Sequence, residues 1–258
     1  MLATLGDLVD DIVVQLAGPI NVATDTSSII LRRRGGSAAN VAATAGVLGQ
    51  PVRFLGQVGA DAVGAALVAE LKAAGVDTQF VHRSGSTGAI VVLVAPDAER
   101  SMLTDRRTCA ELDDPRPEWL DDVTTLHVPL YSLIEGATAM TAATLIGWAH
   151  DRDVAVSLDL SSTALMTEAG LDSVRALVAR LRPSSVFANR SEVDMYGLDQ
   201  LPADAIAVVK NGPDPALIRV PPGANTSATT YMVPATGITA VTDTTGAGDA
   251  FAAGFLTF

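Results

Sequence analysis

The chain has 258 residues, of which 29 are acidic and 17 are basic, and its formal net charge is −12. Hydrophobic residues make up 48% of the sequence, which is enough for a sizeable buried core and excludes a disordered chain. The acidic balance, with no basic stripe, excludes a protein that binds nucleic acid without sequence preference.

The sequence offers little for disulfides or metal sites. Cys109 is the only cysteine, so neither an intrachain disulfide nor a zinc site built on cysteines can form. The histidines, His82, His127 and His150, lack the spacing of metal ligands. The first residues resemble no signal peptide, and the apolar runs are of strand length, too short to span a membrane. We therefore expect a cytoplasmic protein.

Short β-type runs alternate with helical stretches along the chain. The predicted strands are 12–14, 52–58, 89–95, 126–130, 154–158, 186–187, 206–209 and 238–242. The predicted helices are 37–48, 62–74, 135–150, 171–181 and 247–258. This alternation predicts right-handed βαβ units and a mostly parallel sheet, hence an α/β fold in a single domain over 1–258.

Two stretches, 18–34 and 82–107, interrupt the alternation. They are β-like, polar and rich in turns, and they contain no helical periodicity. We interpret them, with bounds of about 12–34 and 83–107, as a small β-lid that projects from the main sheet.

Acidic residues follow the first apolar run, in Gly6-Asp7-Leu8-Val9-Asp10-Asp11. Carboxylates at the C-terminal edge of a parallel sheet face the ligand crevice and can bind sugar hydroxyl groups. A solvated acidic turn is the commoner fate of any single Asp. The residues alone leave both interpretations open.

A glycine pair opens the first predicted helix, in Gly35-Gly36-Ser37-Ala38-Ala39-Asn40. Small residues allow a ligand to approach closely, and the Asn40 amide offers both a donor and an acceptor, as a sugar hydroxyl group requires. Tight packing of a helix on a sheet with a solvated Asn explains the same pattern equally well.

The strongest signal is the segment 243–251, DTTGAGDAF, which opens the last predicted helix. Its glycines and the helix N-terminus form an anion cradle. A carboxylate such as Asp249 is electrostatically unfavourable in an anion-binding site. Its presence is explained if Asp249 accepts the proton of a hydroxyl group that attacks a bound phosphoryl group. An ordinary glycine turn remains the alternative. The segment is neither a Walker A loop, because it lacks the lysine, nor a dinucleotide fingerprint, because Phe251 replaces the third glycine.

Together these segments resemble the signatures of the PfkB, or ribokinase-like, carbohydrate kinases. Residues 35–42 resemble the first signature of that family, and residues 243–251 with Gly254 and Phe255 resemble the second. Further matches are 56–61 with Gly64, Thr87-Gly88, Glu99-Arg100-Ser101 and Asn189-Arg190-Ser191-Glu192. The resemblance implies a ribokinase-like three-layer α/β/α domain with a mostly parallel sheet and a β-lid.

The resemblance also implies an activity, the ATP-dependent phosphorylation of a hydroxyl group on a sugar, nucleoside or related polyol. Asp249 would be the general base, and the amides of Gly246, Ala247 and Gly248 would form the anion hole. The residues that would hold the acceptor are Asp11, Gly35, Gly36 and Asn40.

The same resemblance assigns residues to ATP and cations. Glu192, with Asn189, would help to place Mg²⁺ through water, and Lys210, Gly212 and Thr244 would lie in the nucleotide site. In some members the positions of Asp243 and Thr245 hold a monovalent cation, here K⁺. The lid often forms the dimer contact in relatives, so a homodimer is expected.

The sequence departs from the family pattern at two places, and two alternative functions are considered. The sequence ends at Phe258, earlier than is usual for the family, so we expect either that part of the adenine pocket is missing or that something else covers that face. Many relatives have proline after the acid at Asp159, and we assign Asp159 no role. The rivals are a catalytically weak sugar-binding or nucleoside-binding regulatory protein and a nucleotide-binding oxidoreductase. The second is disfavoured because no dinucleotide fingerprint follows an early strand.

One charge run, Arg32–Arg34, has no place in these motifs. It could contact a phosphorylated or acidic substrate from the lid, but runs of charge are usually solvated edges. We therefore assign Arg32–Arg34 no role, and none to Arg106 or Arg107 near the expected lid hinge.

Overall fold

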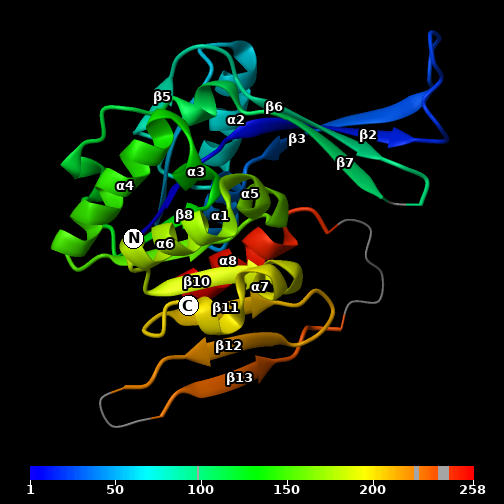
Figure 1. The fold of residues 1–258 in the computed structure, drawn as a ribbon. Helices are drawn as coiled ribbons and strands as arrows, with labels where there is room; N and C mark the ends of the chain where they lie inside the picture. Colours follow the sequence, from blue (N-terminus) through cyan, green and yellow to red (C-terminus); the bar gives the residue numbers. More distant parts are fainter. Residues whose placement is uncertain (98, 224–226, 238–243) are drawn as a thin grey trace.

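A nine-stranded sheet forms the centre of the molecule in the computed structural model, which describes residues 1–97, 99–223, 227–237 and 244–258 (Figure 1). Its strand order is β13-β12-β11-β10-β9-β8-β1-β4-β5. The strands are β1 (Leu2–Leu5), β4 (Val52–Val58), β5 (Val81–Arg83), β8 (Thr125–Pro129), β9 (Ala155–Asp159), β10 (Ser185–Asn189), β11 (Ile206–Lys210), β12 (Ala216–Val220) and β13 (Thr229–Val233). The run from β5 to β11 is parallel, and β12 and β13 extend it antiparallel.

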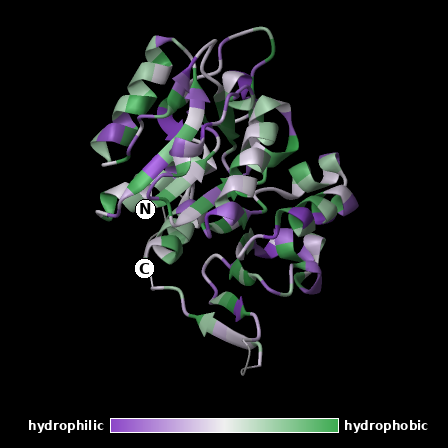
Figure 2. Cartoon of the chain, turned by 90° about the vertical axis from the view of Figure 1, so that its left-hand side faces the viewer, coloured by the Kyte–Doolittle hydropathy of each residue, from purple (hydrophilic) through white to green (hydrophobic). Residues whose placement is uncertain are grey.

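The parallel strands consist of apolar runs because helices cover both faces of the sheet. The helices are α1 (Ser37–Val47), α2 (Ala62–Ala73), α3 (Tyr131–Ile134), α4 (Gly136–Asp151), α5 (Thr163–Ala169), α6 (Leu171–Leu181), α7 (Arg190–Tyr196) and α8 (Ala247–Thr257). One buried cluster joins α1, α2 and α8 to the sheet, and a second joins α4, α6 and α7 to the other face. Figure 2 shows helices that carry hydrophobic and hydrophilic residues together, as expected where one side of each is buried. This three-layer α/β/α architecture confirms the predicted fold class.

The order in which the chain adds strands to the sheet reverses at β1. From β1 it continues to β4 and β5 on one side, and β8 and the later strands follow on the other. In open α/β sheets, ligands bind outside the carboxyl ends of the strands at such a switch point. The turn after β1 and the ends of β9, β10 and β11 meet at this edge.

A second, four-stranded sheet projects from the main body and is called the projecting sheet below (Figure 1). Its strand order is β3-β2-β6-β7, with β2 (Val9–Leu16), β3 (Ser28–Gly35), β6 (Ala89–Val94) and β7 (Arg100–Asp105). Most residues of β3 and β7 are exposed.

The sequence placed most core elements within a few residues of their observed bounds. The helix predicted over 171–181 and the strand predicted over 52–58 coincide with α6 and β4. β5 belongs to the main sheet, although its last residue falls inside the expected lid segment 83–107. The strand predicted over 238–242 lies outside the described residues. Within the described chain, no helix has the length and hydrophobicity needed to cross a membrane.

Candidate active site

Two helices that begin at glycines meet at the switch point. α1 follows Gly35-Gly36, and the N-cap residue of α8 is Gly246, whose φ of 73° lies in the left-handed region that favours glycine. A side chain at Gly35 would overlap the Asp11 carboxylate. The glycines therefore allow the start of α1 to lie directly against β2.

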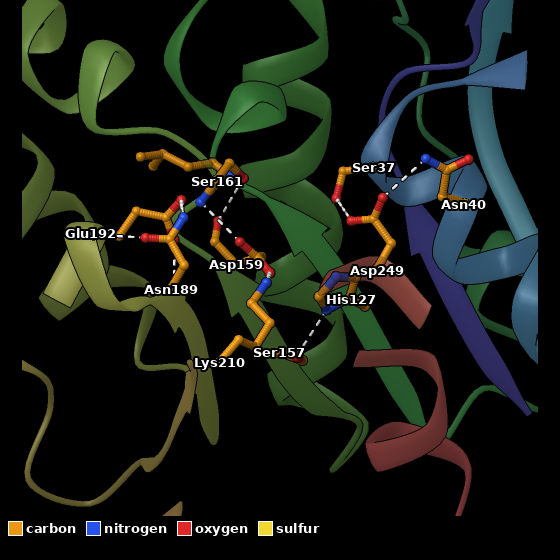
Figure 3. Close-up of polar contacts among 11 residues, drawn as sticks. Ser37, Asn40, His127, Ser157, Asp159, Ser161, Asn189, Glu192, Lys210 and Asp249 are labelled. Atoms are coloured by element: carbon orange, nitrogen blue, oxygen red, sulfur yellow. Dashed lines mark hydrogen bonds and ion pairs between the residues drawn. The ribbon is translucent and has the colours of Figure 1, made fainter. Parts of the chain in front are cut away.

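Asp249 lies in the first turn of α8 and is held by two donors of α1 (Figure 3). Its Oδ1 accepts a hydrogen bond from Ser37 Oγ at 2.8 Å, and its Oδ2 accepts one from Asn40 Nδ2 at 2.9 Å. Burial raises the pKa of Asp249 above its ordinary value, and the two hydrogen bonds oppose that shift. The carboxylate is thus fixed in position by neutral groups.

Asp11 and Arg34 lie beside this pair. Arg34 Nη2 donates to Asn40 Oδ1 at 3.2 Å. Asp11 Oδ1 is buried and has no hydrogen-bond partner among the described residues. Burial, with repulsion from Asp10, raises the pKa of Asp11 to about 6. The structure therefore brings together the four residues predicted to hold an acceptor, which are Asp11, Gly35, Gly36 and Asn40.

An ion pair crosses the ends of β9 and β11. Lys210 Nζ lies 2.5 Å from Asp159 Oδ2, and both side chains are largely buried. Burial alone would lower the pKa of Lys210, but Asp159, Glu192 and Asp249 raise it. A Cβ atom on Gly248 would lie 3.3 Å from Lys210 Nζ, so this ammonium group also faces the anion cradle.

Asn189 and Glu192 form a capping box at the start of α7. Glu192 Oε2 accepts from the Asn189 backbone N–H at 2.7 Å, and Glu192 Oε1 accepts from Asn189 Nδ2 at 2.7 Å. The Glu192 N–H donates to Asn189 Oδ1 at 2.9 Å. Burial, with the charge of Asp159, raises the pKa of Glu192 to about 7. The Asn189 backbone N–H and the charge of Lys210 oppose this shift.

A cavity of about 730 Å³ connects these groups. This volume is in the usual range for small-molecule sites. Its lining includes the predicted nucleotide residues and the start of α8, namely Asn189, Glu192, Lys210, Gly212, Thr244, Ala247, Gly248 and Asp249.

One amide of the anion cradle has a hydrogen-bond partner within the chain. The N–H of Ala247 donates to the Thr244 carbonyl oxygen at 3.1 Å and so closes a turn. The N–H of Gly248 lies in the first helical turn, where no carbonyl precedes it by four residues within the helix. Of the two residues expected to hold K⁺, Asp243 lies outside the described residues. Thr245 Oγ1 accepts a hydrogen bond from Arg100 Nη1 of β7 at 3.2 Å.

Ser37 and Asp159 also line the cavity, although neither was assigned a role from the sequence. The position of Asp159 at the carboxyl end of a strand was the available signal. Two other groups are assigned no part in this chemistry. Arg106 pairs with Asp7 at 2.7 Å and with Glu135 at 2.9 Å. His127 is fully buried, and burial lowers its pKa to about 4.

Comparison with known proteins identifies carbohydrate kinases as relatives of this chain. A model described as pfkB family carbohydrate kinase matches residues 3–258. An ATP-dependent ribose-1-phosphate kinase of Halopiger xanaduensis is 33% identical over 231 residues, which are 86% of this chain and 72% of that protein.

Solved structures share the fold. A probable sugar kinase of Rhizobium etli is 26% identical with a TM-score of 0.85, over 99% of this chain and 85% of that chain. A provisionally assigned ribokinase II of E. coli, solved with ATP and Mg²⁺, is 20% identical with a TM-score of 0.80, over 99% of this chain and 84% of that chain.

Proposed function

The chain belongs to the pfkB family of carbohydrate kinases. We propose that it transfers the γ-phosphoryl group of ATP to a hydroxyl group of a sugar, nucleoside or related polyol, with Asp249 as the general base. Family membership makes the protein a phosphotransferase that acts on an alcohol group. The observation that carries the proposal is the position of Asp249, fixed by Ser37 and Asn40 at the edge of the anion cradle.

The proposed step needs one proton acceptor and a bound phosphoryl group. The acceptor hydroxyl group gives its proton to the Asp249 carboxylate as its oxygen attacks the γ-phosphorus atom. The bond from that phosphorus to the β-γ bridging oxygen breaks, and ADP leaves. Gly246 and Gly248 would stabilise the charge that develops on the phosphoryl oxygens, whereas Ala247 supports the turn.

The acceptor would bind between β2 and α1. The Asp11 carboxylate and the Asn40 amide lie on either side of the glycine pair, and together they offer acceptors and a donor to adjacent hydroxyl groups. The unpartnered Oδ1 of Asp11 is the group that a bound hydroxyl would satisfy.

The large cavity would bind the triphosphate. Lys210 supplies a cation beside Gly248, and Asn189, Gly212 and Thr244 line the same space. Mg²⁺ fits this donor set, because burial raises the pKa of Glu192 to about 7 and a further cation beside it would favour the charged carboxylate. No cluster of three His, Cys, Asp or Glu side chains in the described residues could cage a metal. Glu192 would therefore hold the ion through water, with the phosphates as its other ligands. Bound there, Mg²⁺ neutralises phosphate charge.

The projecting sheet would act as a lid that excludes water from the site. The contact of Arg100 on β7 with Thr245 before α8 supports this role, because it links the sheet to the cradle. Exposed apolar side chains on β3 and β7, such as Ile29, Leu31 and Leu103, support a homodimer through the same sheet. K⁺ dependence and a cytoplasmic location remain predictions.

ADP release with ATP–Mg²⁺ over a panel of sugars, sugar phosphates and nucleosides tests the proposal. The panel includes ribose 1-phosphate, because the relative from Halopiger is named for it. We expect release that depends on one acceptor. If an acceptor raises the melting temperature but no compound supports release, the regulatory-protein alternative is favoured. A rise with NAD(H) alone would favour the oxidoreductase.

A further inference from the structure

A second cavity, distinct from the one that would bind ATP, lies under the projecting sheet. It has a volume of about 370 Å³. Aliphatic side chains of β2 and β6 form much of its wall, and the charged groups that line it are Asp11, Arg33, Arg34 and Arg100. We propose that the acceptor carries a phosphate group of its own and that Arg33, Arg34 and Arg100 bind this phosphate. This inference rests on the proposed kinase function and names its class of acceptor.

Strand register places two of these arginines on one face of the sheet. Asp11 pairs with Arg33 across β2 and β3, and Val94 pairs with Arg100 across β6 and β7. Gln15 of β2 pairs with Val94 in turn, and Gln15 is four residues after Asp11. Because side chains alternate between faces with a period of two, Asp11, Arg33 and Arg100 share the face that lines the cavity. β3 and β7 are the two edges of the sheet, so the cavity receives a guanidinium group from each edge.

Arg34 has the strongest signature of a ligand-binding side chain. It lies directly before Gly35, and its Nη2 donates to Asn40. Its Nε is buried and has no hydrogen-bond partner among the described residues, and the same holds for Asp11 Oδ1 in the same cavity. Burial lowers the pKa of Arg34, and the charges of Glu70 and Asp249 oppose that shift. A phosphate oxygen at Nε would satisfy both the donor and the charge.

Arg32 shows what a solvated arginine in the same run looks like. Its guanidinium group pairs with Asp10, and its side chain is 59% exposed. A neutral sugar needs hydroxyl partners and gains little from three guanidinium groups. A phosphate dianion matches them, because guanidinium groups bind its oxygens in pairs. In a chain with a net charge of −12, arginines from two strands around one cavity point to an anionic ligand.

The reaction then joins two phosphorylated compounds. A hydroxyl group of a sugar monophosphate loses its proton to Asp249 and attacks the γ-phosphorus atom of ATP, and the products are a sugar bisphosphate and ADP. The arginines would lower the repulsion between the acceptor phosphate and the triphosphate, with Arg100 placed beside Thr245 at the start of the cradle.

The test compares acceptors in matched pairs, each with and without its phosphate. The pairs are ribose with ribose 1-phosphate and ribose 5-phosphate, fructose with fructose 6-phosphate, and adenosine with its 5′-monophosphate. We expect kcat/KM for one phosphorylated member to exceed that of its parent by roughly 100-fold. Arg34→Gln and Arg33→Gln should reduce this ratio by roughly 30-fold each, and Arg34→Lys by less, because it keeps the charge.

Arg107→Gln is the matched control. It removes the same charge near the end of β7, but its exposed side chain pairs with Asp105 and lies outside the cavity. The phosphate preference should stay the same in this variant. Circular dichroism checks that each variant is folded.

The outcomes separate this inference from the proposed function. Turnover of a parent sugar with no gain from its phosphate overturns the inference and leaves the kinase in place. If no compound is turned over, the proposed function fails, and calorimetric binding of the same pairs decides the inference. Binding of ribose 1-phosphate, but not ribose, that is weakened in Arg34→Gln supports it. Equal binding of both compounds, or of neither, overturns it.

Discussion

The acceptor side of the site and the nucleotide side hold their charged groups differently. On the acceptor side, Asp249 accepts hydrogen bonds from neutral groups of α1, and Asp11 and Arg34 each keep a buried polar atom without a partner among the described residues. On the nucleotide side, Lys210 forms an ion pair with Asp159, and both carboxylate oxygens of Glu192 accept hydrogen bonds from Asn189.

Among the described residues, only the acceptor side therefore has unpaired polar atoms in place for its ligand. On the acceptor side, Ser37 and Asn40 of α1 fix a carboxylate more than 200 positions later in the sequence, and the unsatisfied atoms await a ligand. On the nucleotide side, the groups satisfy one another, so phosphate and Mg²⁺ must compete with internal pairs. We therefore expect substitutions on the nucleotide side to affect both stability and ATP use, and those on the acceptor side to affect mainly acceptor use.

Lys210→Met should have the largest effect. It leaves Asp159 and Glu192 buried without their cation, which should lower the free energy of unfolding by about 3 kcal/mol. It should also reduce kcat/KM for ATP by roughly 100-fold, because a charged donor to the phosphates is lost. Chemical denaturation and initial rates measure the two effects. Lys72→Met, at the exposed end of α2, is the control that should change neither. A variant with normal stability would contradict the ion-pair account.

Asn40→Ala tests the acceptor side. It removes one donor to Asp249 and one acceptor for Arg34, so the acceptor KM should rise by roughly 30-fold. The KM for ATP should stay nearly constant, since Asn40 does not line the nucleotide cavity. Steady-state kinetics with each substrate varied in turn provide the measurement. Equal changes in both constants would show that the two sides are not separate.

The pH dependence of acceptor binding gives a smaller effect. Burial raises the pKa of Asp11 to about 6, so this carboxyl group becomes protonated below that pH and loses its charge as a hydrogen-bond acceptor. The acceptor KM should therefore rise roughly tenfold between pH 7 and pH 5. In Asp11→Asn the acceptor KM should be higher at neutral pH and should lose this inflection. A retained inflection would assign the titration to another group.

Most of the fold, but only part of the candidate active site, could be predicted from the sequence. Apolar runs and helical periodicity located β4, α1 and α6 because burial repeats along each of them. The two glycine-led helix starts were visible because glycine marks close backbone approach. The short helices α5 and α7 carry too few turns for a periodic signal, and neither was predicted.

The sequence does not show which side chains pair across different strands. Asp159 and Lys210 are 51 positions apart, and nothing local to either residue shows that β9 and β11 bring them together. The run Arg32–Arg34 looks uniform in sequence, yet the Arg32 side chain forms an ion pair with Asp10, whereas strand register places Arg33 opposite Asp11 at the cavity. The Asn-x-x-Glu pattern of 189–192 is also the signature of a capping box, and the structure shows that hydrogen-bonding pattern.

The most direct test of the account is the single-turnover rate of Asp249→Asn, measured with calorimetric binding of the acceptor to the same preparation. Asn keeps the shape and a hydrogen-bonding oxygen for Ser37 or Asn40, but it cannot take the proton. We predict that phosphoryl transfer slows by roughly 1,000-fold while acceptor affinity changes by less than about fivefold. Asp172→Asn, at an exposed position of α6, is the control. Phosphoryl transfer near the wild-type rate would contradict the role of Asp249 as the base.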